Sequence, residues 1–81
     1  MTPDDVCVKF ADSGGKIKVW ELDDEETIVI EGTREALQFM SDLFRAQAEA
    51  NEDGSGLSPF GAGNALFAPG STRGIYISRI A

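Results

Sequence analysis

Alternating apolar and polar residues recur in the first 31 positions of the chain. The alternating segments are residues 5–10, 16–22 and 27–31. A two-residue period is typical of a half-buried β-strand, and the β-branched residues of the third segment favour the same structure. The segments are separated by short turn sequences, at residues 12–15 and 23–26, which favour antiparallel hairpins. The pattern therefore predicts a three-strand meander.

Residues 34–50 change to the period of an amphipathic helix. Thr33 can cap its first turn through the side-chain hydroxyl, and Glu35 suits the positive end of the helix dipole. The apolar arc of this helix consists of Ala36, Leu37, Phe39, Met40, Leu43, Phe44, Ala46 and Ala50. The arc spans about 200°, twice the roughly 100° stripe that packing on one sheet requires. We therefore expect Phe39 or Phe44 to meet a second surface, such as the following loop or another subunit.

The character of the chain changes after the helix. Residues 54–74 hold six of the nine glycines and two of the three prolines, and no acidic side chain. Residues 51–72 are interpreted as a glycine-rich loop that packs in part, with a candidate short strand at 65–68. Residues 73–80 alternate again and are predicted to form the last strand.

Together these elements predict a single α+β domain over residues 1–81. Its antiparallel sheet has four to five strands (the three-strand meander, the C-terminal strand and the candidate short strand), and its one helix packs on one face. The predicted core consists of Val6, Val8, Phe10, Ile17, Val19, Ile28, Ile30, Leu37, Met40, Leu43, Phe44, Ile75 and Ile77.

Charge narrows the possible partners. Fourteen acidic and seven basic side chains give a net charge of −7, and residues 1–53 carry all fourteen acids with five of the bases, 5 − 14 = −9. Such a chain repels a phosphate backbone and an anionic membrane surface, so we expect no nucleic-acid and no membrane partner. A basic protein partner would instead be attracted. With no apolar run of membrane-spanning length and no signal-peptide pattern, we expect a cytoplasmic protein.

The residue inventory disfavours catalysis. The chain contains no histidine and only one cysteine, Cys7. It therefore lacks the commonest general base, the commonest metal ligand and every Ser-His or Cys-His nucleophile pair. The acidic run at residues 49–54 resembles the start of a calcium loop, but its twelfth position is Phe60 rather than the required glutamate. We expect no catalytic residues, no metal and no cofactor.

The sheet face opposite the helix is the best candidate for a binding surface. It would carry Trp20, Leu22, Val29 and Tyr76, which is more apolar than a solvated sheet face, and tryptophan and tyrosine are enriched in binding hot spots. The acidic turn lies beside it. The predicted partner-binding residues are Trp20, Leu22, Val29, Tyr76, Asp23, Asp24, Glu25 and Glu26.

Three functions are compatible with this surface. The favoured one is a non-catalytic protein-binding domain, with an immunity-like inhibitor of a basic partner as its specific form. The second is a homodimer that buries Trp20, Tyr76 or the Phe39 flank against its own copy. The third is a small-ligand module that uses the glycine-rich loop. The loop could also fold back over the Trp20 face and bury it within the monomer.

Two segments carry a resemblance to a known group of proteins. They are Ile30-Glu31-Gly32-Thr33-Arg34-Glu35-Ala36-Leu37, where a strand passes into the helix, and Gly70-Ser71-Thr72-Arg73-Gly74-Ile75-Tyr76-Ile77, where the last strand begins. The chain resembles small bacterial α+β proteins built from strands, one helix and a final strand, some of which are similar to immunity proteins of bacterial toxin systems. Many members of this group have no known function, and the resemblance carries no site residues across.

Overall fold

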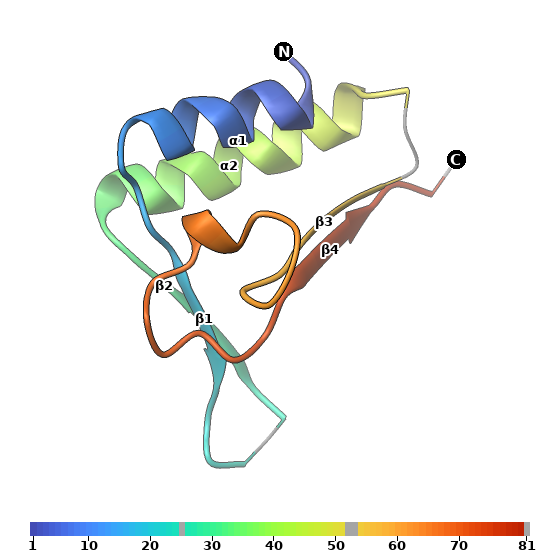
Figure 1. The fold of residues 1–81 in the computed structure, drawn as a ribbon. Helices are drawn as coiled ribbons and strands as arrows, with labels where there is room; N and C mark the ends of the chain where they lie inside the picture. The colour runs from blue at the N-terminus through green and yellow to red at the C-terminus, as the bar shows by residue number, and fades with distance from the viewer. Residues whose placement is uncertain (25, 52–53, 81) are drawn as a thin grey trace.

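The computed structural model describes residues 1–24, 26–51 and 54–80, and it has an α+β architecture. In chain order its elements are α1 (Pro3–Asp12), β1 (Lys18–Glu21), β2 (Ile28–Glu31), α2 (Arg34–Glu49), β3 (Gly54–Leu57), the 3₁₀ helix η1 (Asn64–Leu66) and β4 (Ile75–Ser78). The two α-helices lie antiparallel, side by side, as one layer, and the two β-sheets lie on the same side of that layer (Figure 1). No described helix is both long and apolar enough to cross a membrane.

The first element is a helix, so the prediction of a strand at residues 5–10 is wrong. Its first turn is closed by a capping box in which the Thr2 hydroxyl accepts from the Asp5 amide and the Asp5 carboxylate accepts from the Thr2 amide, both at 3.1 Å. Pro3 follows the cap at the first helical position, where its missing N–H costs nothing. Helical spacing buries Val6 and Phe10 but leaves Val8 58% exposed.

The second helix confirms the prediction for residues 34–50 to within one residue. The Thr33 hydroxyl accepts from the Ala36 amide at 3.2 Å, as expected of the cap. Its buried side packs on α1, where the rings of Phe10 and Phe39 stack with centroids 4.2 Å apart. The second surface expected for Phe39 or Phe44 is therefore α1 in the case of Phe39, whereas Phe44 remains 52% exposed.

The strands form two separate two-stranded antiparallel sheets, which corrects the predicted single sheet of four to five strands. In the first, β1 pairs with β2, and Trp20 lies opposite Val29. In the second, β4 pairs with β3, a strand inside the segment predicted to be a loop. The pairing β1–β2 is the one hairpin of the predicted meander that forms. The strand predicted at residues 73–80 is confirmed over Ile75–Ser78, but it joins the other sheet.

The candidate strand at residues 65–68 forms only a single parallel bridge, between Phe67 and Ile17, directly after η1. From there the chain runs along the edge of β1 that faces away from β2. The Ala68 amide donates to the Ile17 carbonyl at 2.7 Å, and the Thr72 amide donates to the Val19 carbonyl at 2.8 Å. Between these bonds the chain turns at Pro69 and Gly70, where φ is +92°, so no continuous ladder forms.

The core lies between the helical layer and the two sheets. It consists of Val6, Phe10, Ile17, Val19, Ala36, Phe39, Met40, Leu43, Ala46, Leu66 and Phe67. Five residues predicted for the core are exposed instead, namely Val8, Ile28, Ile30, Leu37 and Phe44. The core includes instead Phe39, which packs against α1, and Leu66 and Phe67 from η1 and its flank. The only polar residue buried among those described, Gln47, accepts a hydrogen bond from the Ser55 hydroxyl, which joins α2 to β3.

Candidate protein-binding surface

The β1–β2 hairpin projects away from the helices (Figure 1). Lys18, Trp20, Val29 and Glu31 share one of its faces, because directly opposed residues of an antiparallel pair point the same way. The Trp20 indole N–H donates to the Glu31 carboxylate at 2.8 Å, and the Lys18 ammonium lies 5.0 Å from the centre of the indole ring. Lys18 and Glu31 also approach to 3.8 Å. These contacts hold the half-buried Trp20 side chain in one orientation on this face.

The acidic turn at the end of the hairpin is organised by Asp24. Its carboxylate accepts from the amides of Glu26 and Thr27, at 2.9 and 3.1 Å, and from the Thr27 hydroxyl at 3.1 Å. Asp23 and Glu26 are exposed. Glu25, the remaining predicted binding residue of the turn, lies outside the described residues. The turn therefore presents carboxylates to solvent from a backbone that one aspartate holds in place.

Hydrogen bonds from the Glu26 and Thr27 amides lower the pKa of Asp24 below its ordinary value of 3.8. Because the pKa is lower in the folded chain, these hydrogen bonds stabilise the turn above about pH 4, the pKa of an aspartate in the unfolded chain. This stabilisation is lost as the pH falls through the lowered pKa of Asp24. We expect an NMR titration of the Asp24 carboxyl to give a midpoint below 3.8, with the Glu26 and Thr27 amide shifts following the same curve. A midpoint at or above 3.8 would contradict the turn described here.

Apolar side chains flank the acidic turn, and an ion pair anchors its base. Leu22 is 39% exposed and Ile28 is 51% exposed. At the base, the Arg73 guanidinium donates to the Glu21 carboxylate at 2.7 Å, which ties the hairpin to the segment before β4. The hairpin thus combines exposed carboxylates with exposed apolar area, a mixture suited to contact with another protein.

Tyr76 does not lie on this surface. It belongs to β4, in the other sheet, and its ring covers Gly54 and Gly56 of β3, where an added Cβ would come within 2.6 and 2.9 Å of it. The ring thereby shields a strand that has no side chains of its own at those positions. Of the predicted binding residues, the structure brings together Trp20, Leu22, Val29, Asp23, Asp24 and Glu26, and it separates Tyr76 from them.

Cys7 lies on α1 and does not share a face with Lys9, because residues two apart on a helix point in different directions. Burial, and then the nearby Asp4 carboxylate, raise the pKa of the Cys7 thiol above 9.0. The thiol is therefore protonated near neutral pH, which is the unreactive form.

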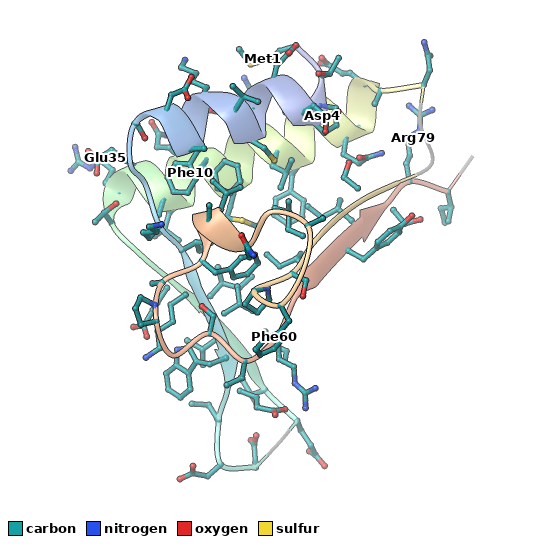
Figure 2. The ribbon with its side chains drawn as sticks, viewed as in Figure 1. Met1, Asp4, Phe10, Glu35, Phe60 and Arg79 are labelled. Atoms are coloured by element: carbon teal, nitrogen blue, oxygen red, sulfur yellow. The ribbon has the colours of Figure 1, made fainter. Side chains whose placement is uncertain are left out.

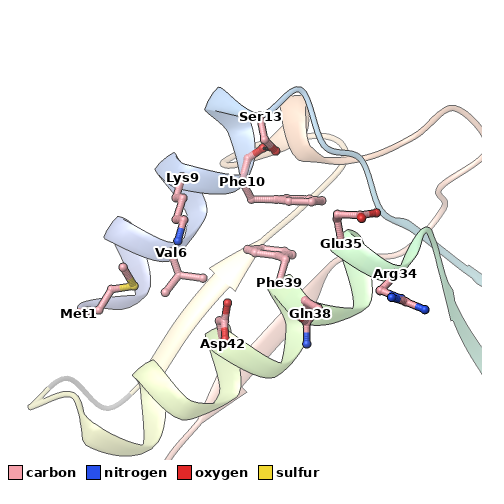
Figure 3. A pocket seen from close by; sticks show the side chains of 10 residues that line it. All are labelled: Met1, Val6, Lys9, Phe10, Ser13, Arg34, Glu35, Gln38, Phe39 and Asp42. Atoms are coloured by element: carbon pink, nitrogen blue, oxygen red, sulfur yellow. Dashed lines mark hydrogen bonds between the residues drawn. The ribbon is translucent and has the colours of Figure 1, made fainter.

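A groove between the helices was not predicted, because it requires α1. Figure 3 shows its lining residues, with Lys9 on α1, Gln38 and Asp42 on α2, and the stacked rings of Phe10 and Phe39 between the two helices. Its volume is about 200 Å³, below the 300–1,000 Å³ typical of small-molecule sites. The signal that could have revealed it is the capping box, Thr2-Pro3-Asp4-Asp5, at the start of the chain.

The glycine-rich loop is packed through its own backbone hydrogen bonds. The Ser58 amide donates to the Ala62 carbonyl at 2.8 Å, and the Leu66 amide donates to the Gly63 carbonyl at 2.9 Å. Its most exposed large side chain is Phe60, at 79%, which points away from the helices (Figure 2). The amides used in this way are not available to an anionic ligand, and the small-ligand hypothesis stays a prediction.

Among the residues that the structure describes, no three cysteine, aspartate or glutamate side chains are grouped so that they could hold a metal ion. Comparison of the chain with protein-family models, curated proteins and solved structures finds no match. The function must therefore be argued from the surface of the chain itself.

Proposed function

We propose that this chain is a non-catalytic protein-binding domain that docks its acidic β1–β2 hairpin on a basic surface of another protein, as an immunity-like inhibitor would. The observation that carries the proposal is the projecting hairpin itself (Figure 1). Residues 21–31 contain six acidic side chains, and no lysine or arginine occurs from residue 19 to residue 33. The hairpin is therefore a concentrated negative charge held clear of the rest of the chain.

The carboxylates of the hairpin divide into two groups. Glu21, Asp24 and Glu31 make hydrogen bonds within the chain, which fix the shape of the hairpin. Asp23 and Glu26 are exposed and flank the turn, where a cationic surface could reach them. Charges of this kind speed association and select partners of opposite sign. The nearby Leu22 and Ile28 supply apolar area that would be desolvated on contact.

A binding role without catalysis is supported by the chemistry of the side chains. The chain has no histidine, and the pKa of its one thiol is raised rather than lowered. Neither an activated nucleophile nor a base beside one is available from these groups.

Neutralising the exposed hairpin charges is expected to weaken partner binding. The variant Asp23→Asn/Glu26→Gln changes the net charge from −7 to −5, and so does the control Asp4→Asn/Asp12→Asn on α1. We expect the hairpin variant to bind a basic partner about tenfold more weakly, and the control to bind it nearly as well as the parent chain. The measurement is affinity capture from the lysate of the organism that makes the protein, then titration with the purified partner.

Salt gives a second criterion for the same proposal. The amount of basic partner captured should fall as the salt is raised from about 0.05 to 0.5 M, because at the higher concentration exposed charges are screened within a few ångströms. Captured proteins that are not basic, or equal losses for the two variants, would overturn the proposal.

A further inference from the structure

Strand β2 has an open edge. It pairs with β1 on one side, and among the described residues no backbone hydrogen bond joins it to anything on the other side. The corresponding outer edge of β1 is different, because residues 66–73 run along it and occupy the backbone groups of Ile17 and Val19.

The register of the hairpin shows which groups point outward. The Leu22 amide donates to the Thr27 carbonyl at 2.9 Å, so this pair is hydrogen-bonded across the hairpin. Hydrogen-bonded pairs alternate along an antiparallel ladder, so Val29 and Glu31 also direct their N–H and C=O groups toward β1. The backbone groups of Ile28 and Ile30 therefore point to the open edge.

Among the described residues, neither a proline nor a covering segment blocks this edge. Natural edge strands are usually blocked by a proline, a bulge or a charged side chain in mid-strand. Here β2 begins with Ile28, Val29 and Ile30, of which the two isoleucines are 51% and 39% exposed, and its one charged residue, Glu31, lies at its end. An unprotected, β-branched edge is a template for pairing with another strand.

We propose that β2 pairs antiparallel with β2 of a second copy of this chain, about a two-fold axis at Val29. The segment is self-complementary about that residue, since Ile28 then faces Ile30 of the second copy, and Thr27 faces its Glu31. Each Ile28–Ile30 pair exchanges two backbone hydrogen bonds, so all the outward groups of both isoleucines are used. A pairing shifted by two residues would instead set Ile28 opposite Gly32, or Ile30 opposite Glu26, both of which lie outside β2.

Side chains of the two copies meet on both faces of the resulting four-stranded sheet. On one face the four isoleucines form one cluster. On the other, Val29 faces Val29 of the second copy, and Trp20 flanks it in each copy, which gives a continuous apolar row across the sheet. An isologous contact of this kind closes on itself and does not propagate.

Charge selects the antiparallel arrangement. Two chains of −7 repel each other, and a parallel pairing would set their acidic turns side by side. The antiparallel pairing puts the two turns at opposite ends of the sheet, where both remain exposed. Partner binding through the exposed carboxylates of Asp23 and Glu26 therefore remains possible in the dimer, whereas the apolar area of Ile28 would be taken up by the pairing.

Solution mass tests the proposal. Sedimentation equilibrium of the full chain over about a hundredfold range of concentration should show a shift from 8.7 kDa to twice that mass. Raising the salt from about 0.05 to 0.5 M should favour the dimer, because it screens repulsion between like-charged chains. Binding to a basic partner should respond to salt in the opposite sense, so the two proposals can fail separately.

Amide exchange locates the contact. The amides of Ile28 and Ile30 should exchange about tenfold more slowly at the higher protein concentration. The Val29 amide, which already faces β1, should change little. A dimer without this alternation would place the contact elsewhere and overturn the proposal, as would a chain that stays at 8.7 kDa under all these conditions.

A matched pair of variants completes the test. Ile28→Lys adds a charge to the edge and sets it opposite Glu21 of β1 within the monomer, so the hairpin itself is retained. Val8→Lys makes the same change of charge at a similarly exposed site on α1. Circular dichroism should show both variants folded. We expect dimerisation to be lost in Ile28→Lys and kept in Val8→Lys, and a dimer that survives Ile28→Lys would overturn the proposal.

Discussion

Replacing Phe10 with alanine is expected to lower the free energy of unfolding by about 3–5 kcal/mol, the range for removing a buried aromatic ring. Phe10 is 6% exposed and stacks on Phe39 with an interplanar angle of 5°. The variant loses the packing of the ring, leaves a cavity between α1 and α2, and forfeits the aromatic pair. Urea unfolding followed by circular dichroism would measure the change.

The control is Val8→Ala, two residues earlier on the same helix. Val8 is 58% exposed, so its truncation should cost about 0.5 kcal/mol or less. If Phe10→Ala does not fold, Phe10→Leu offers a milder loss that can still be compared with Val8→Ala. Equal losses at the two positions would indicate a strand, in which both side chains share one face, and would contradict α1.

The first helix shows why alternation alone can mislead. Val6 and Phe10 are four residues apart, a spacing that satisfies both the two-residue period of a strand and one face of a helix. Only Val8 separates the two interpretations, and its β-branched side chain favours the strand. The capping box of Thr2 and Asp5, with Pro3 between them, outweighs that preference by fixing the first turn.

The division into two sheets depends on contacts between distant parts of the chain. The hairpin of β1 and β2 is local, and its turn residues predicted it. Strand β3 contains Gly54 and Gly56, which disfavour a strand in isolation. It forms because Tyr76 of β4 covers both glycines, a contact across some twenty residues that no local pattern reveals.

The candidate binding surface, like the sheets, was predictable only where its residues are close in sequence. The residues of the hairpin were brought together as expected because they are close in sequence. Tyr76 would share this face only in a single sheet. Because it lies in the second sheet, it is not part of the candidate binding surface. The open edge of β2 was not predictable either, because the sequence does not give the order of the strands.

Alanine substitution along α2 should separate two leucines that the helical period places on the same arc. Leu43→Ala is expected to lower the free energy of unfolding by about 2–5 kcal/mol, since Leu43 is only 1% exposed. Leu37→Ala should cost less than about 1 kcal/mol, because that side chain is 50% exposed and is already largely hydrated in the folded state. Both variants remove the same atoms from the same helix, so helix propensity cancels in the comparison.

The difference in the free energy of unfolding between Leu43→Ala and Leu37→Ala shows where the core ends along α2. Leu43 contacts the interior beneath the helical layer, whereas Leu37 and the half-exposed Phe44, seven residues apart, follow one outer flank of α2. Chemical denaturation of both variants at a low protein concentration, where the chain is monomeric, isolates this effect from self-association. Equal losses at the two positions would contradict the burial described for α2, because an apolar arc stabilises a fold only where other side chains cover it.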